Sequence, residues 1–148
     1  MKIFANNKKA LFDYEIVENI EAGLELTGYE VKSVKNGNIN LKGAFVNFYK
    51  NEAWLTGAHI QKYKMAGLMP DYDPERRRKL LLHKKQIQYL QGKSLEKGLT
   101  IVPLKVYTND RLIKVDIGIG RGRKLYNKKE YLKKRDVDRE IDRTLKNQ

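Results

Sequence analysis

The last 28 residues, Arg121 to Gln148, offer few apolar side chains to bury, so the core must be built from the residues before them. The first part of this segment, Arg121 to Arg135, holds eight Lys or Arg residues and one acidic residue, a charge of about +7. Blocks of like charge repel and usually form interaction tails. Basic segments that fold only on a polyanion are typical of RNA-binding proteins. The segment therefore indicates a nucleic-acid partner, although a solvated helix without a partner would share its composition.

The overall composition supports a nucleic-acid partner. The chain has 148 residues, enough for one domain, which we expect at residues 1–120 and followed by a basic tail at 121–148. Thirty-one Lys and Arg against 18 Asp and Glu leave a net charge of +13, typical of a protein that contacts phosphate backbones. A membrane surface would attract the same charge, but the sequence has no long apolar span and no strongly apolar helix face.

The compartment is indicated by two further features. The chain has no cysteine, hence no disulfide framework and no thiolate chemistry. Its N-terminus lacks the apolar segment of a signal peptide. We therefore expect a cytoplasmic protein.

The first part of the chain predicts a bent strand and a short helix. Residues Asp13 to Leu26 alternate in polarity around Gly23, which predicts one long strand with a bend or bulge at the glycine. Thr27 and Glu30 then form a capping-box pattern, and Gly37 marks a helix end. The helix between them is expected to turn two residues inward, Val31 and Val34, and two outward, Lys32 and Lys35.

The remaining pattern predicts two hairpins and a second helix. One hairpin spans Ile39 to His59 with its turn at Asn51 and Glu52, and the other spans Gly98 to Gly118. Between them, Pro70 to Pro74 reads as a loop that precedes a helix from Glu75 to Gln91. The predicted fold class is therefore mainly β with flanking helices (α+β): a small antiparallel OB-like barrel plus a C-terminal tail.

The predicted helix from Glu75 to Gln91 is the most informative local pattern. Its expected core stripe contains Leu80, His83, Ile87 and Leu90, with His83 partly buried. The opposite side carries Arg77, Leu81, Lys84, Lys85 and Gln88, so Leu81 would be an apolar residue within a basic patch. Cations for phosphates and an apolar group against an unstacked base are what an RNA site uses. A single exposed leucine is also common without any function.

No catalytic constellation is present in the sequence. The two histidines are far apart and lack metal-site spacing, so we expect no metal and no cofactor. The glycine-rich stretch from Gly118 to Gly122 lacks the Lys-Ser/Thr of a phosphate-binding loop and is expected to be a flexible exit from the last strand. Glu18 and Glu21 are more simply surface residues than a catalytic pair, and Trp54 is more simply a core residue.

Six blocks along the chain resemble one protein family in their order. They are Ile20–Ser33 (IEAGLELTGYEVKS), Asn40–Lys42 (NLK), Glu52–Leu55 (EAWL), Arg78–Lys84 (RKLLLHK), Gly98–Lys105 (GLTIVPLK) and Lys124–Lys129 (KLYNKK). Together they resemble the SsrA-binding proteins, the bacterial tmRNA-binding partners in trans-translation. The resemblance covers nearly the whole chain.

This resemblance implies a fold, a function and partners. It implies an OB-like barrel that binds the tRNA-like domain of tmRNA and, with elongation factor Tu on the charged tmRNA, delivers it to stalled ribosomes. It also implies that the C-terminal tail meets the small-subunit decoding centre, enters the empty mRNA channel and becomes helical there. The resemblance thus explains a tail that carries charge without a core.

The resemblance also assigns residues. The family's RNA-facing glutamate matches Glu21, its apolar contact matches Leu81, and its first-helix basic positions match Lys32 and Lys35. With the basic residues of the neighbouring segments, the expected RNA-binding set is Glu21, Lys32, Lys35, Asn40, Lys42, Arg77, Arg78, Lys79, Leu81, Lys84 and Lys85. The expected ribosome-contacting set in the tail is Gly122, Arg123, Lys124, Tyr126, Asn127, Lys128, Lys129, Lys133, Lys134 and Arg135.

The chain departs from the family pattern at Tyr126 and Asn127, where many relatives have His-Asp. An aromatic residue at 126 can still stack on a base, whereas Asn127 lacks the carboxylate. The tail's apolar positions beyond the basic block, Val137, Ile141 and Leu145, form only a thin stripe, so we expect the free tail to be disordered.

Two other functions remain open from the residues alone. One is a generic OB-type single-strand binder, which would line a groove with aromatic residues. The aromatic residues of this chain are expected mostly at core positions of strands, which argues against it. The other is an RNA-modifying or RNA-cleaving enzyme, which the missing catalytic cluster disfavours.

Overall fold

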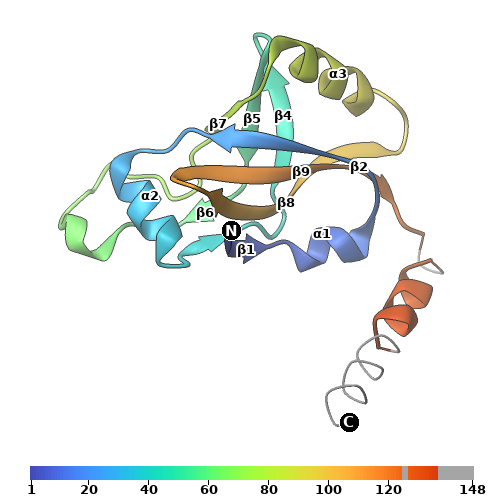
Figure 1. Ribbon diagram of the computed structural model, residues 1–148, viewed down its shortest axis with the longest axis horizontal. Coiled ribbons are helices and arrows are strands. Elements are labelled where there is room, and N and C mark those ends of the chain that lie inside the picture. The colour runs from blue at the N-terminus through green and yellow to red at the C-terminus, as the bar shows by residue number, and fades with distance from the viewer. Residues whose placement is uncertain (125–126, 137–148) are drawn as a thin grey trace.

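The computed structural model describes residues 1–124 and 127–136, and Figure 1 shows the arrangement of its helices and strands. In chain order the elements are β1 Lys2–Asn6, α1 Lys8–Asp13, β2 Tyr14–Leu24, α2 Gly28–Lys35, β3 Ile39–Asn40, β4 Phe45–Tyr49, β5 Glu52–Thr56, β6 His59–Ile60, the 3-10 helix η1 Lys64–Ala66, β7 Arg78–Leu81, α3 Lys84–Ser94, β8 Leu99–Asn109 and β9 Leu112–Gly122. A further helix covers residues 127–136.

Seven strands form one antiparallel sheet in the order β1-β8-β9-β2-β7-β5-β4, and β3 and β6 form a separate small pair. The sheet curls so that β4, at one edge, also lies against β8 near the other edge. Its concave side holds the main core, in which Leu55, Ile60 and Ile117 are completely buried. The predicted fold class, an antiparallel OB-like barrel with flanking helices, is therefore confirmed.

The longest hairpin, β8 with β9, forms where the sequence predicts a hairpin, but β9 continues past the predicted end at Gly118 as far as Gly122. Gly118 and Gly120 lie within β9, so the predicted flexible exit from Gly118 to Gly122 is wrong. A Cβ at Gly118 would lie 2.8 Å from Leu104 Cδ1, and a Cβ at Gly120 would lie 2.8 Å from Tyr14 Cβ. These glycines allow neighbouring side chains to pack directly on the strand.

The long strand β2 lies where the sequence predicts it, but the break in its pairing register lies elsewhere than predicted. The register shifts between Ile16 and Glu18, whereas Gly23 pairs regularly with Lys114 on one side and Leu81 on the other. The predicted bulge at Gly23 is therefore wrong. The glycine serves a close contact with Leu81, described below.

The predicted capping box and helix α2 are confirmed. Thr27 Oγ1 accepts a hydrogen bond from the Glu30 backbone N–H, and a Glu30 carboxylate oxygen accepts one from the Thr27 N–H. Val34 is fully buried, and Lys32 and Lys35 are exposed, as the pattern predicts. The helix is thus fixed in place by its first turn and its inner face.

The segment predicted as one helix from Glu75 to Gln91 instead forms strand β7 and helix α3. In β7 the side chains alternate, with Arg78 and Leu80 buried and Leu81 exposed. The strand pairs with β5 on one side and β2 on the other, so its backbone groups are satisfied across the sheet. These long-range hydrogen bonds and the burial of Leu80 outweigh the local helix propensity of the segment.

The prediction of which residues of this segment are buried is therefore wrong in part. Leu80 and Leu90 are buried, but His83 is exposed and precedes the first turn of α3. Trp54, predicted to be in the core, lies half-buried on the outer side of β5. The outer sheet surface therefore carries more aromatic area than the sequence predicts.

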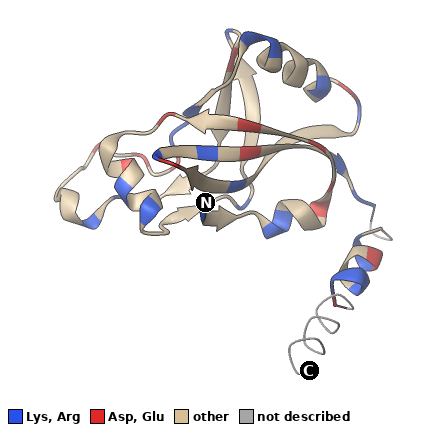
Figure 2. Ribbon diagram, in the orientation of Figure 1, with Lys and Arg blue, Asp and Glu red and all other residues tan. Residues whose placement is uncertain are grey.

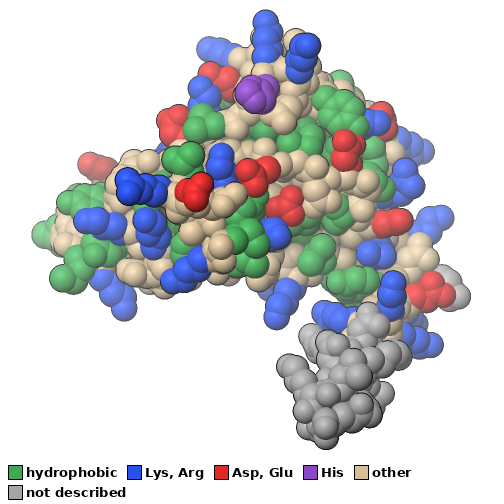
Figure 3. Space-filling model, viewed as in Figure 1, with side chains coloured by type: hydrophobic (Ala, Val, Ile, Leu, Met, Phe, Trp, Pro, Cys, Tyr) green, Lys and Arg blue, Asp and Glu red, His purple; other side chains and the backbone are tan. Residues whose placement is uncertain are grey.

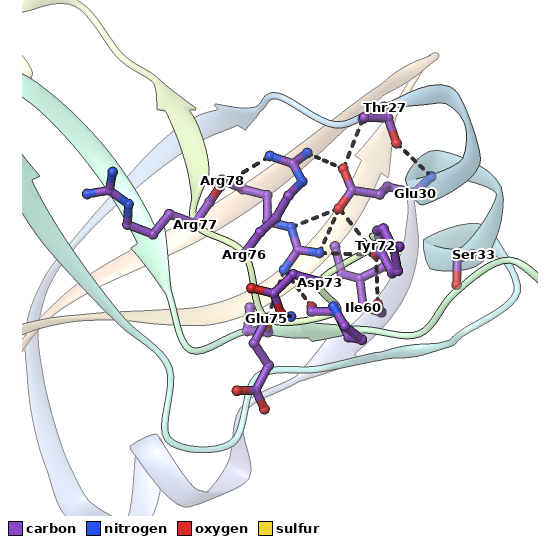
Figure 4. A network of polar contacts seen from close by, with 12 residues as sticks. Thr27, Glu30, Ser33, Ile60, Tyr72, Asp73, Glu75, Arg76, Arg77 and Arg78 are labelled. Carbon is purple, nitrogen blue, oxygen red and sulfur yellow. Dashed lines mark hydrogen bonds and ion pairs between the residues drawn. The ribbon is translucent and has the colours of Figure 1, made fainter. Parts of the chain in front are cut away.

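A buried ion pair joins α2 to β7 (Figure 4). The Arg78 guanidinium donates to one Glu30 oxygen from Nε at 2.9 Å and from Nη2 at 2.6 Å, and the two side chains are at most 1% exposed. Arg78 Nη1 also donates to the carbonyl oxygens of Ala58 and Pro74. Arg76 pairs with the second carboxylate oxygen. Arg78 Nη2 donates further to the Tyr72 hydroxyl at 3.2 Å, so all five guanidinium N–H groups have an acceptor and the buried charge is compensated.

This network sets the ionisation of Glu30. Burial alone would raise the pKa of the Glu30 carboxyl, but hydrogen bonds from Arg76, the Thr27 N–H and Arg78 lower its pKa below the ordinary value. Because the pKa is depressed in the folded state, the carboxylate contributes its full stabilisation above the unfolded pKa of about 4.3. That stabilisation is lost as the pH falls through the folded-state pKa.

We predict that Glu30→Gln lowers the free energy of unfolding by about 3–5 kcal/mol, because it leaves Arg78 buried without a counter-charge. The variant should also lose part of the decline in stability that the wild type shows below about pH 4.3. Denaturant unfolding at pH 7 and pH 3.5 measures both effects.

The matched control is Glu25→Gln, which removes an exposed carboxylate just before the same helix. We expect a change within about 0.5 kcal/mol for this control. Equal stability of the two variants at pH 7 would contradict the role assigned to the buried pair.

Candidate functional site

The best candidate site is a groove of ≈ 590 Å³ between β2, β7 and the start of α3. We call it the groove and define it by its lining residues: Glu21, Gly23, Glu52, Lys79, Leu80, Leu81, Leu82, His83, Gln86, Ile87 and Lys114. It combines an apolar floor with cations, carboxylates and amide groups. Such a mixture suits a ligand that has both flat apolar faces and charged groups.

The apolar centre of the groove is Leu81. It is 51% exposed, although it belongs to a central strand of the sheet. Its cross-strand neighbour is Gly23, where an added Cβ would lie 3.1 Å from Leu81 Cβ. The glycine therefore leaves room for the leucine side chain to lie across β2 and present its outer side to solvent.

Two carboxylates on β2 are held in place by tyrosine hydroxyl groups. The Tyr107 hydroxyl donates to Glu21 Oε2, and the Tyr89 hydroxyl donates to Glu18 Oε2 at 2.5 Å. Burial, followed by the Glu21 carboxylate, raises the pKa of Tyr107 well above its ordinary value, so this phenol stays a donor. Glu21 is exposed, so its carboxylate can also accept a hydrogen bond from an N–H group of a ligand.

The cations lie around these carboxylates. Figure 2 shows acidic segments along β2 and β9, and Figure 3 shows Lys and Arg side chains surrounding the acidic centre of this face. Lys79 pairs with Glu52 at 3.3 Å, and Lys114 lies on β9 directly opposite Gly23. Lys84 and Lys85 are exposed in the first turn of α3, next to the groove. The arrangement favours an anionic ligand that also donates hydrogen bonds to a central acceptor.

The structure brings together only part of the expected RNA-binding set. Glu21, Lys79 and Leu81 line the groove, and Lys84 and Lys85 border it. Four other exposed members lie apart, on α2, on β3 and just after β3: Lys32, Lys35, Asn40 and Lys42. Lys32 there lies over two aromatic rings, 5.9 Å from Tyr29 and 5.6 Å from Tyr63.

The Arg78 side chain does not reach the protein surface. Its side chain is 0% exposed and is consumed by the ion pair with Glu30, so its expected place in the RNA-binding set is wrong. Arg77 is exposed on the opposite side of the backbone, as Figure 4 shows. The alternation of a strand, not the spacing of a helix, decides which of the consecutive arginines faces solvent.

Four polar residues of the groove are outside the expected RNA-binding set: Glu52, His83, Gln86 and Lys114. Gln86 Oε1 accepts a hydrogen bond from the His83 backbone N–H at 3.0 Å, which fixes the amide at the start of α3. Lys114 reaches the groove only through the register of β9 on β2, which leaves no local signal in the sequence. Gln86 supplies only the Gln half of a capping box, because His83 stands where the pattern has Ser or Thr.

The helix of residues 127–136 lies beside the end of the barrel. Lys128 Nζ is 3.2 Å from Asp13 Oδ1 and lies 5.3 Å from the centre of the Phe12 ring. The Arg123 guanidinium stacks on Tyr131 at 4.6 Å. Burial would raise the pKa of Asp13, but hydrogen bonds from Lys9 and Lys128 lower it.

Between this helix and the barrel lies a cavity of ≈ 820 Å³. Four cations of the expected ribosome-contacting set line this cavity, namely Arg123, Lys124, Lys134 and Arg135, together with the neighbouring Arg121. Gly122 is the last residue of β9, while Lys129 and Lys133 are exposed on the helix. Tyr126 and the stripe of Val137, Ile141 and Leu145 lie outside the described residues.

Two absences concern residues 1–124 and 127–136 alone. This part of the chain contains no group of three or more His, Asp or Glu side chains placed to hold a metal ion. Within the same ranges, no helix has the length and apolar content required to cross a bilayer.

The curled antiparallel sheet, the basic groove with an exposed leucine and the basic helical extension define an RNA-binding protein of OB-like architecture. The chain belongs to the SmpB protein family, which matches residues 4–147. The resemblance found in the sequence is thereby confirmed.

Individual relatives agree with the family. The SsrA-binding protein of Enterococcus hirae is 52% identical over 146 residues, which cover 99% of this chain and 94% of the relative. The SsrA-binding protein of Gloeothece citriformis is 48% identical over 145 residues, covering 98% and 94%.

A solved structure is similar as well. A chain described as "tmRNA-SmpB: a journey to the center of the bacterial ribosome" matches with a TM-score of 0.68 and 45% sequence identity. The match covers 82% of this chain and 85% of that chain.

We predict that Leu81→Asp leaves the fold intact and weakens RNA binding about tenfold or more, because it removes an apolar contact and adds a negative charge. The adjacent Leu80→Asp should destabilise the protein by several kcal/mol, because Leu80 is 1% exposed. Thermal melting and RNA titration of both variants measure the difference. A large loss of stability in Leu81→Asp would place this side chain in the core instead of the groove.

Proposed function

We propose that this chain is a non-catalytic RNA-binding factor of the bacterial cytoplasm that binds the tRNA-like domain of tmRNA. It delivers charged tmRNA, which also carries elongation factor Tu, to ribosomes stalled on messages without a stop codon. The observation that carries the proposal is the groove, which presents the apolar group, acceptor and cations of an RNA site in a chain 52% identical to an SsrA-binding protein.

In this proposal four groove residues and the bordering lysines of α3 have physical roles. Leu81 contacts the flat face of an unstacked base or a sugar, since it is the exposed apolar side chain at the centre. Glu21, held by Tyr107, accepts hydrogen bonds from base N–H groups. Lys79, Lys114 and the α3 lysines bind phosphates, and each neutralised phosphate releases counterions.

The cations on the α2 side provide a second area of contact. Lys32, Lys35 and Lys42 are exposed there, together with Asn40. Asn40 Oδ1 accepts a hydrogen bond from the Lys42 backbone N–H at 2.9 Å, which fixes the turn that presents Lys42. These residues extend the positive surface that a folded RNA elbow would meet.

The division into two functional parts is also proposed. The barrel holds tmRNA, and the tail probes the decoding centre and the empty mRNA channel with Arg123, Lys124 and the cations and amide of the 127–136 helix. The basic block gains phosphate contacts inside a channel walled by ribosomal RNA, and the i,i+4 pair Glu130–Lys134 supports a helix there. We expect residues 129–136, whose helix has few apolar side chains to bury, to show weak amide-exchange protection in the free protein.

We predict that full-length protein and a variant ending at Gly122, the last residue of β9, both co-purify tmRNA from the host. Sequencing the co-purified RNA and titrating the tRNA-like domain test this. Affinity should fall with salt, with a slope of log K against log salt of about −0.9 per neutralised phosphate. Loss of binding by the shortened variant at unchanged melting temperature would contradict the division into two parts.

We predict that replacing Lys128, Lys129, Lys133 and Lys134 by Glu abolishes peptide tagging of stalled products while tmRNA binding stays measurable. The replacement reverses four charges that would meet ribosomal RNA phosphates. The matched control replaces the same four residues by Arg, which keeps the charge, and should tag normally. Normal tagging by the Glu variant, scored by mass spectrometry of products from a message without a stop codon, would refute the tail mechanism.

A further inference from the structure

An arginine guanidinium lies close to two aromatic rings on the outer face of strands β4 and β5. The Arg77 guanidinium lies 4.9 Å from the centre of the Trp54 ring and 5.8 Å from that of Tyr49. Lys50 Nζ lies 5.4 Å from the same tyrosine ring. We call these four residues, Tyr49, Lys50, Trp54 and Arg77, the platform.

The sheet register builds the platform. Trp54 pairs with Asn47 on β4 and with Lys79 on β7, so it belongs to the outward set of positions, while its neighbours Ala53 and Leu55 are buried. Lys50 and Asn51 both have positive φ angles, 51° and 62°, which is the geometry of a type I′ hairpin turn. The turn places Lys50 at the end of the tyrosine ring.

The platform leaves aromatic surface in water. Tyr49 is 54% exposed, and Phe45, two outward positions back along β4, is 41% exposed. Among the described residues Tyr107 is the one aromatic side chain that is buried, and others such as Phe48 only partly pack against the core. The expectation that the aromatic residues lie mostly at core positions is therefore wrong. Exposed aromatic rings combined with cations are the surface on which unpaired bases stack.

The platform is adjacent to the groove but separate from it. The ion pair between Lys79 and Glu52, which lines the groove, lies between the two because Lys79 is directly opposite Trp54. Arg77, Lys50 and Lys79 outnumber the acidic residues of this area, where Glu52 pairs with Lys79. The platform therefore favours an anionic ligand, in preference to a protein surface that is poor in acidic residues. The guanidinium plane of Arg77 further favours a ligand with a planar group.

We propose that the platform is a second nucleic-acid site, which binds one unpaired nucleotide of an RNA strand. The base stacks on the Arg77 guanidinium plane and the Tyr49 ring, and Lys50 meets the adjoining phosphate. The site does not depend on the tRNA-like domain being the ligand of the groove, because its chemistry recognises any unstacked base.

Trp54 is the single tryptophan of the chain, so its fluorescence reports on the platform alone. The experiment titrates the full-length protein with an unstructured 12-nucleotide RNA and with a 12-base-pair RNA duplex of the same composition. The single strand should quench Trp54 fluorescence saturably, whereas the duplex, whose bases are already stacked, should leave it nearly unchanged. Equal quenching by both RNAs, or none by the single strand, would overturn the proposal.

Variants separate stacking from charge. Arg77→Ala should weaken single-strand binding about tenfold, the scale of one lost base stack. Arg77→Lys should weaken it nearly as much, because it keeps the charge but loses the plane. Lys97→Ala, on the exposed connection between α3 and β8, removes one charge elsewhere and should cost no more than about twofold.

These experiments test the platform separately from the proposed function. If Arg77→Lys binds the single strand as tightly as the wild type, the platform contacts only a phosphate, and the proposed base site is refuted. Tyr49→Ala provides the second test at an exposed position, with a melting curve to confirm folding, and should weaken binding to a similar extent. Failure of the wild type to bind the tRNA-like domain would refute the proposed function and leave the fluorescence result unaffected.

Discussion

The ion pair between Glu30 and Arg78 is the interaction on which both sides of the barrel depend. It ties the first turn of α2 to the start of β7, and Arg78 also holds the carbonyl oxygens of Ala58 and Pro74. Tyr72 completes the network by donating to the Ile60 carbonyl oxygen at 2.8 Å. Because both charges are buried, losing either one costs far more than the pair contributes in isolation. A loop of two prolines is thereby fixed against the sheet.

The same ion pair determines which side chains face outward. Once Arg78 points inward to Glu30, strand alternation directs Arg77 and Lys79 to the outer face, and the next inward residue is Leu80. Leu81 is then exposed over Gly23. The groove and the platform are thus two parts of one outer surface, whose register is fixed by a contact on the inner side. A one-residue slip in β7 would bury Leu81 and expose Leu80.

Local signals predicted the elements whose stability is local. The capping box at Thr27 was sufficient to predict α2. The alternation of polar and apolar residues in β8 and β9 was sufficient to predict the long hairpin. Helix α1 was missed because it has six residues and depends on Asn7, which donates to the Pro103 carbonyl oxygen across the barrel. The segment containing β7 was predicted as a helix because its partners, β2 and β5, are distant in sequence. Lys114 reaches the groove for the same reason, through pairing that no local pattern encodes.

The acidic residues of the outer face explain how a chain of net charge +13 can be selective. Cations alone would bind any phosphate backbone, since counterion release carries no information about sequence or shape. Glu18 and Glu21 repel a backbone that approaches β2 directly, and the hydroxyl groups of Tyr89 and Tyr107 keep both carboxylates in place. An RNA that places base N–H groups at Glu21 and phosphates at the surrounding lysines satisfies both requirements. In the proposed function, selectivity comes from the fixed Glu21 acceptor within the basic surface, and affinity comes from the lysines around it.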